Sequence, residues 1–116
     1  MKNVVVLGST GSIGTSTLKV AEDLPDRIRL VGLAAGNNAE ALTQQTLKHR
    51  PEAVSLNDPQ KAAELQTALG TATKVHSGNE GLLKLATLPS ADIVLIAIVG
   101  TAGLQPALAA IRAGKD

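Results

Sequence analysis

Three glycines near the N-terminus have the spacing of a phosphate-binding turn. They lie in the segment Gly8-Ser9-Thr10-Gly11-Ser12-Ile13-Gly14, between the aliphatic run Val4–Leu7 and a helical pattern. Such a turn lets the backbone approach a pyrophosphate and lets the helix pack closely on the strand. We expect the amides of Thr10 to Ile13 to point at the phosphates, aided by the helix dipole and by the hydroxyls of Thr10 and Ser12. A turn that only redirects the chain is the alternative, but its position after a buried strand favours phosphate binding.

The end of the second predicted strand indicates which dinucleotide would bind. This strand ends in Ala34-Ala35-Gly36-Asn37-Asn38, where an NAD-binding fold normally has an acidic residue about 20 positions after the glycines. A 2′-phosphate would therefore meet no repulsion, and it would find backbone amides, two side-chain amides and a helix N-terminus. The segment favours NADP over NAD, although it holds no Arg or Lys to bind the phosphate. Asn38 is also a plausible helix N-cap, and the two roles are compatible.

A third candidate segment follows the last predicted strand, Ile93–Val99. It reads Ile98-Val99-Gly100-Thr101-Ala102-Gly103, and we expect the strand to lie beside the first one, where ligands bind in this topology. Gly100 and Gly103 would let the chain pass close to a bound dinucleotide. They could equally make only the turn into the last helix.

The composition excludes several other functions. The chain of 116 residues has no Cys and no aromatic residue, so a thiolate metal site, a Cys nucleophile and a base-stacking platform are absent. A net charge of +1 is too small for nucleic-acid binding, and no apolar run is long enough for a signal peptide or a membrane span. His49 and His76 are assigned to the surface because no acid stands at metal-ligand spacing. We therefore predict an intracellular domain with no catalytic or metal-binding residue.

Strands and helices alternate along the chain. Strands are predicted at Val4–Leu7, Ile28–Ala35, Ala53–Leu56, Lys74–His76 and Ile93–Val99. The expected inward-facing helix residues are Leu18 and Ala21 before Pro25; Leu42, Thr46 and Leu47 in a helix from the cap Asn38 to Arg50; Ala62, Leu65 and Leu69; Leu82, Leu83, Leu85 and Ala86 before Pro89; and Leu104, Ala107, Leu108 and Ile111. This order predicts an α/β fold, a Rossmann-type doubly wound parallel sheet with helices on both faces.

Three local signals predict helix ends. Asp58-Pro59 places a capping carboxylate before a proline at the first helical position. Ser77-Gly78-Asn79-Glu80 matches a capping box, and Gly114 is a C-terminal cap for the last helix. The chain stops where the next strand should begin. We therefore expect residues 1–116 to be a single NADP(H)-binding domain, truncated before a further strand.

These motifs together resemble a known family. VVLGSTGSIG (5–14), AGNN (35–38), AIVGTAGL (97–104) and IRAGK (111–115) look like the N-terminal domain of the 1-deoxy-D-xylulose 5-phosphate reductoisomerases. Taken with the turn and strand ends described above, the predicted cofactor-binding residues are Gly8, Ser9, Thr10, Gly11, Ser12, Ile13, Gly36, Asn37, Asn38, Val99 and Gly100. Relatives often have a basic residue at the position of Asn37, so this chain departs from the family pattern where the 2′-phosphate is expected.

The resemblance implies an NADPH-dependent oxidoreductase of the non-mevalonate isoprenoid pathway. Such an enzyme is expected to be cytoplasmic and homodimeric, and to use Mg²⁺ or Mn²⁺. It would rearrange and reduce 1-deoxy-D-xylulose 5-phosphate to 2-C-methyl-D-erythritol 4-phosphate, with its metal ligands and substrate site beyond Asp116. Two other hypotheses remain: a different reductase with a GxxGxxG turn, of the semialdehyde dehydrogenase or dihydrodipicolinate reductase type, and a non-enzymatic module that senses a dinucleotide.

Overall fold

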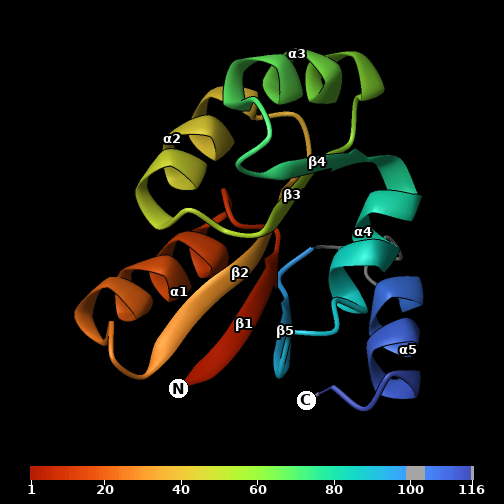
Figure 1. Ribbon diagram of the computed structural model, residues 1–116. Helices are drawn as coiled ribbons and strands as arrows, with labels where there is room; N and C mark the ends of the chain where they lie inside the picture. Colours follow the sequence, from red (N-terminus) through yellow and green to blue (C-terminus); the bar gives the residue numbers. More distant parts are fainter. Residues whose placement is uncertain (99–103, 116) are drawn as a thin grey trace.

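The fold was obtained as a computed structural model that describes residues 1–98 and 104–115. Strands and helices alternate in chain order (Figure 1). The elements are β1 (Lys2–Leu7), α1 (Ser12–Asp23), β2 (Ile28–Ala35), α2 (Ala39–His49), β3 (Ala53–Leu56), α3 (Pro59–Leu69), β4 (Lys74–Ser77), α4 (Gly78–Ala86), β5 (Ile93–Ile96) and α5 (Leu104–Arg112). Among the described residues, no helix has both the length and the apolar character needed to cross a membrane.

The strands form one parallel sheet in the order β4-β3-β2-β1-β5. The chain builds the sheet outward from β1 to β4 and then returns to place β5 on the other side of β1. The predicted doubly wound arrangement is confirmed, as is the position of the last strand beside the first. The point between β1 and β5 at which the winding reverses is where open α/β sheets bind their ligands.

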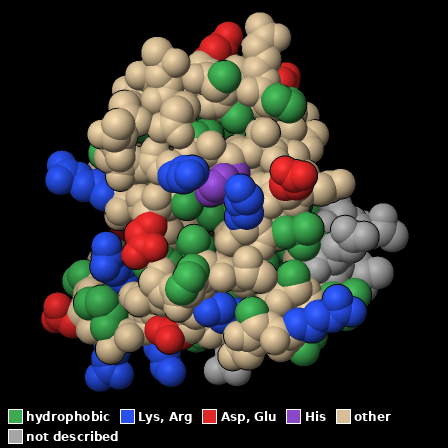
Figure 2. All heavy atoms as spheres, turned by 45° about the vertical axis from the view of Figure 1, so that its right-hand side comes forward, with side chains coloured by type: hydrophobic (Ala, Val, Ile, Leu, Met, Phe, Trp, Pro, Cys, Tyr) green, Lys and Arg blue, Asp and Glu red, His purple; other side chains and the backbone are tan. Residues whose placement is uncertain are grey.

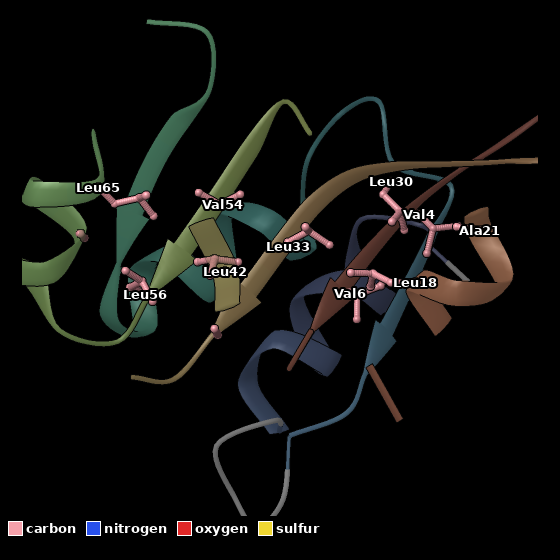
Figure 3. Close-up of a cluster of buried hydrophobic side chains, with 12 residues drawn as sticks. Val4, Val6, Leu18, Ala21, Leu30, Leu33, Leu42, Val54, Leu56 and Leu65 are labelled. Atoms are coloured by element: carbon pink, nitrogen blue, oxygen red, sulfur yellow. The ribbon is translucent and has the colours of Figure 1, made fainter. Parts of the chain in front are cut away.

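Helices cover both faces of the sheet. On one face, α1, α2 and α3 pack through Leu18, Leu42 and Leu65 against alternate strand residues such as Val6 and Leu33 (Figure 3). On the other face, α4 and α5 contribute Leu85, Ala86 and Ala110 to a second cluster with Val5, Leu7, Val31 and Ala34. The buried side chains are aliphatic and small, so the core is filled without any aromatic ring.

The predicted last strand is shorter and less buried than expected. β5 pairs with β1 from Val4↔Ile93 to Leu7↔Ile96, and its residues are only partly buried. Its pairing ends because β1 leaves the sheet at Gly8, so Ala97 and Ile98 have no partner strand, although the Ala97 amide still donates to the Leu7 carbonyl at 2.8 Å. The predicted end at Val99 lies outside the described residues.

Most of the predicted helix ends are confirmed, but the capping box is wrong. Asn38 accepts from the Ala41 amide, and Asp58 accepts from the Gln60 amide before Pro59. Gly114 has φ +78 and ends α5 with two bonds, Gly114 amide to Ile111 carbonyl and Lys115 amide to Ala110 carbonyl, which form a Schellman motif.

Ser77 stands at the N-cap of α4 but makes no capping hydrogen bond with its side chain. The next residue, Gly78, has φ +64, so the chain enters the helix by a path that the capping box does not use.

Two predicted inner faces are also partly wrong. Leu42 and Thr46 of α2 are buried as expected, but Leu47 is 63% exposed. On α5, Leu108 and Ile111 are 44% and 69% exposed. Ala110 faces the core in place of Leu108 and Ile111. Its small side chain suits close packing of α5 against α4 and the sheet. Helical spacing alone does not distinguish these two faces.

Candidate functional site

The glycine turn joins β1 to α1 at the carboxyl edge of the sheet. Gly8 has φ +97, and a Cβ there would lie 2.7 Å from the Ala97 carbonyl oxygen, so this position requires glycine. A Cβ on Gly14 would overlap the Gly8 carbonyl oxygen and lie 2.7 Å from Ser9 Cα. Gly14 therefore permits the close packing of helix on turn that the sequence predicts. Gly11 has no such constraint, since its Cβ would meet only the Gly8 oxygen at 3.7 Å.

The start of α1 presents unused amides. Gly8 and Ser9 donate to the Ala34 carbonyl at 2.8 and 2.9 Å, and Gly11 donates to Gly8 at 3.3 Å. Within the part of the chain that the structure describes, the amides of Thr10, Ser12 and Ile13 have no acceptor. Three of the four amides predicted to face phosphates are thus available, and the amide of Gly11 is used by the turn itself.

The side chain of Ser9 is buried and bonded within the protein, so it is not exposed to a ligand. Its side chain is fully buried, and its hydroxyl donates to Gln45 Oε1 at 2.7 Å. Gln45 Nε2 in turn donates to the Ser9 carbonyl oxygen at 2.9 Å. With its amide also bonded to Ala34, Ser9 offers no free polar group to a ligand, contrary to the prediction that it contacts the cofactor. Through these two bonds Gln45 connects the turn to α2. No local sequence pattern predicts this contact.

The loop after β2 lies at the same edge, because Leu7 pairs with Ala34 in the parallel sheet. Gly36, Asn37 and Asn38 are exposed, and a Cβ on Gly36 would meet nothing within 4 Å. Asn38 Oδ1 caps α2 through the Ala41 amide at 3.1 Å, which leaves its side-chain NH₂ free. As the sequence predicts, the loop itself has no carboxylate.

A lysine that sequence reasoning did not connect with this loop reaches it from α3. Lys61 Nζ donates to the Asn37 carbonyl oxygen at 3.3 Å. The two positions are 24 residues apart, and no local pattern relates them. The loop therefore has a basic neighbour that its own sequence lacks.

A cavity of about 220 Å³ opens between the ends of the strands and α4. Gly8, Gly36 and Ile98 line it together, so the structure brings three of the sequence-derived segments to one site. Ser55 and Leu82 are among its other lining residues. The volume is below the roughly 300–1,000 Å³ of complete small-molecule sites, so the cavity suits one end of a larger ligand. The predicted contacts at Val99 and Gly100 lie outside the described residues.

The titratable side chains with shifted pKa values lie elsewhere. Glu22 on α1 bonds Lys48 on α2 at 2.6 Å, and this contact lowers the pKa of the Glu22 carboxyl. His49 lies 3.5 Å from the same carboxylate, but burial lowers the pKa of its imidazole. Sequence reasoning did not find this contact because Glu22 is distant along the chain.

His76 lies on β4, in a basic environment. Burial lowers the pKa of the His76 imidazole, and the charges of Lys84 and Lys74 lower it further. Figure 2 shows basic and acidic side chains scattered over the face turned toward the viewer. Among the described residues, no group of three or more His, Cys, Asp or Glu side chains could hold a metal ion.

The fold and this edge of the sheet define a class of protein. A parallel sheet whose winding reverses between β1 and β5, with a glycine turn, free amides at the following helix and a cavity at the strand ends, has the architecture of a Rossmann-type domain. The profile of the 1-deoxy-D-xylulose 5-phosphate reductoisomerases matches residues 4–116. The chain belongs to this family.

Individual relatives agree with the family match. The chain is 50% identical over 119 residues to the 1-deoxy-D-xylulose 5-phosphate reductoisomerase of a Synechococcus strain, and it spans 30% of that relative's length. It is 45% identical over 118 residues to the reductoisomerase of Glaesserella parasuis, again with 30% of the length covered. The chain thus spans about a third of the curated relatives that it matches.

Solved structures give the same result. A crystal structure of DOX-P reductoisomerase in complex with NADPH, fosmidomycin and magnesium matches 99% of the chain with a TM-score of 0.92 and 36% identity, over 29% of its own chain. The Zymomonas mobilis enzyme in complex with NADPH matches 98% with a TM-score of 0.90 and 37% identity, over 30% of its own chain. The family assignment favours the reductoisomerase hypothesis over another reductase or a sensing module.

Proposed function

We propose that this chain is the NADPH-binding domain of a 1-deoxy-D-xylulose 5-phosphate reductoisomerase. The observation that carries the proposal is the set of free amides at Thr10, Ser12 and Ile13, which open α1 beside a loop without carboxylates. The chain's membership of a family with NADPH-bound structures supports the same cofactor. The free amides and the loop without carboxylates fit the phosphate groups of NADPH.

The pyrophosphate of NADPH binds at the start of α1 in this proposal. Backbone amides are strong donors to phosphate oxygens, and the partial positive charge at the helix N-terminus adds to the attraction. The exposed hydroxyl of Ser12 is a further donor. Gln45 contributes indirectly, because its two bonds to Ser9 hold the turn in the conformation that aims these amides.

The 2′-phosphate and the adenine bind on either side of Gly36. The exposed loop 36–38 accepts the 2′-phosphate because no acidic side chain of the loop repels it, whereas a carboxylate would select NADH. The cavity lined by Ser55, Leu82 and Ile98 receives the adenine, since aliphatic walls suit a flat base and the hydroxyl can bond a ring nitrogen.

The chemistry that NADPH supplies when bound is hydride donation. The residues of this chain hold the cofactor, orient it and shield it from water. The full reaction, from 1-deoxy-D-xylulose 5-phosphate to 2-C-methyl-D-erythritol 4-phosphate, belongs in this proposal to the intact enzyme, of which relatives are about three times longer. Its substrate site, its Mg²⁺ or Mn²⁺ ligands and its homodimer contacts, with a cytoplasmic location, are assigned to that larger protein. In the described segments of this chain, no cluster of His, Asp or Glu side chains could hold that metal.

A titration with the two dinucleotides tests the cofactor proposal. The protein is mixed with NADPH or NADH, and binding is followed by the fluorescence of the reduced nicotinamide, to which a chain without aromatic residues adds no background. We expect saturable binding of NADPH that is tighter than binding of NADH. No saturable NADPH binding, or a preference for NADH, would refute the proposal.

A further inference from the structure

The loop that follows β2 lies beside the first turns of α3. β2 and β3 are parallel neighbours, with Ala35 opposite Leu56, so both strands end at the same level. The Asn57 amide donates to the Gly36 carbonyl oxygen at 2.8 Å and holds the two strand ends together. Asp58 then caps α3 at once, which brings Lys61 to the loop within a single helical turn.

The ammonium group of Lys61 is available for an anion. Its contact is the carbonyl oxygen of Asn37, a neutral acceptor, at 3.3 Å. The ion pairs found in the described residues involve only Lys48 and His49, so the charge of Lys61 is not neutralised within ion-pair distance there. The lysine side chain is exposed and can turn toward a ligand.

Two acidic residues belong to the helix ends next to this loop. Asp58 begins α3 and uses one carboxylate oxygen, at 2.9 Å, to cap the Gln60 amide. Glu40 is in the first turn of α2 and stabilises that helix end through the dipole. Asp58 is thus bonded to a helix terminus and Glu40 belongs to the first turn of another helix, whereas Lys61 is a cation in direct contact with the loop.

We propose that Lys61 is the residue that selects the 2′-phosphate of NADPH, as a cation supplied from α3 to a loop that lacks one. This inference rests on the proposed function and adds a specificity-determining residue to it. When the 2′-phosphate occupies the surface of loop 36–38, the ammonium exchanges the neutral Asn37 carbonyl for a doubly charged acceptor. A charge-assisted bond of this kind is about twice as strong as a neutral one. NADH, which has a hydroxyl at the same position, gains nothing comparable.

The test measures dissociation constants for NADPH and NADH with four proteins: the wild type, Lys61→Gln, Lys61→Arg and the control Lys74→Gln. Glutamine keeps much of the stem and the helix propensity of lysine, so α3 remains intact. Lys74 is exposed on β4, away from the cavity, and controls for the general loss of a surface charge.

We expect Lys61→Gln to weaken NADPH binding about tenfold, which corresponds to about 1.4 kcal/mol, and to leave NADH binding within about twofold. Lys61→Arg should retain most of the NADPH preference, and Lys74→Gln should not alter it. The preference of the wild type should also decrease with added salt, because the contact is exposed.

If Lys61→Gln weakened the binding of both dinucleotides equally, the role of Lys61 would be purely structural. If it weakened the binding of neither, Lys61 would have no role in binding. Either result overturns this inference while the proposed function stands. A wild-type protein that binds neither dinucleotide overturns both.

Discussion

Replacing Gly14 with alanine should destabilise the protein far more than the same change at Gly11, three residues earlier in the same motif. The Cβ of an alanine at position 14 would overlap the Gly8 carbonyl oxygen and lie 2.7 Å from Ser9 Cα and 2.9 Å from the Gly8 carbonyl carbon. All of these obstacles are backbone atoms. They cannot rotate away as the end of a side chain would, so α1 has to move from the turn.

The size of the effect follows from that movement. Overpacking that forces backbone shifts costs about 1–3 kcal/mol, and a rigid backbone obstacle places Gly14→Ala near the upper end, at about 3 kcal/mol. The shift also draws Leu18 and Ala21 out of the core cluster that they share with Val4 and Val6. At roughly 4 °C per kcal/mol for a domain of this size, Tm should fall by about 12 °C.

Gly11→Ala is the matched control. Its Cβ would lie 3.7 Å from the Gly8 oxygen, an ordinary contact, and its φ of −79° is open to any residue. Alanine is a poorer N-cap than glycine, but it also reduces the entropy of the unfolded chain, and the two effects of about 0.5–1 kcal/mol oppose each other. Urea unfolding should be followed by far-ultraviolet circular dichroism, since the chain has no aromatic residue. Equal midpoints for the two variants would refute the steric argument.

Three other changes test the site and its supports. Gln45→Ala leaves the Ser9 hydroxyl buried without its partner and should lower the free energy of unfolding by about 1–3 kcal/mol. In titrations it should weaken the binding of NADPH and of NADH equally. The control Gln44→Ala, at an exposed neighbouring position, should change neither stability nor binding. Burial lowers the pKa of both histidines, so the unfolded chain binds more protons than the folded one near pH 6. Stability should therefore fall as the pH drops below about 6.5, and denaturant titrations should show a smaller fall in His49→Gln; an unchanged pH profile in that variant would contradict the assignment. Asn37→Asp should not alter stability, since no hydrogen bond of the Asn37 side chain is found among the described residues. It should weaken the binding of NADPH about tenfold relative to the binding of NADH. An unchanged ratio of the two dissociation constants would show that the 2′-phosphate binds elsewhere.

The sequence predicts the fold well because its signals are local. Continuous or mostly aliphatic runs identify β1, β2, β3 and β5, and the caps at Asn38, Asp58 and Gly114 act within a few residues of themselves. The capping box fails for a local reason that composition does not reveal, namely the positive φ of Gly78. The inner face of α5 fails because contacts with α4 and the sheet, not spacing, decide that Ala110 is buried.

The candidate site is predicted only in part. The glycine turn and the loop 36–38 can be located from the sequence because each is a continuous segment next to a strand. The bonds of Gln45 to Ser9 and of Lys61 to Asn37 join residues 36 and 24 positions apart, and only the folded sheet brings them together. Sequence reasoning therefore assigns Ser9 to a ligand that its buried side chain does not face, and finds no cation for the loop.

The approach of Gly8 to Ala97 has a consequence for how this protein can diverge. There the peptide groups of Gly8 and Ala97 meet directly, since a Cβ on Gly8 would lie 2.7 Å from the Ala97 carbonyl oxygen. Every residue type except glycine would place a Cβ in this contact, so a point mutation at Gly8 disrupts the turn and cannot adjust the site gradually. Under the proposed function, we expect changes in cofactor selectivity at exposed positions such as Asn37 and Lys61 and at cavity side chains such as Leu82. We expect saturation mutagenesis to show that Gly8 tolerates no other residue, whereas substitutions at Asn37 and Lys61 change cofactor selectivity without loss of folding.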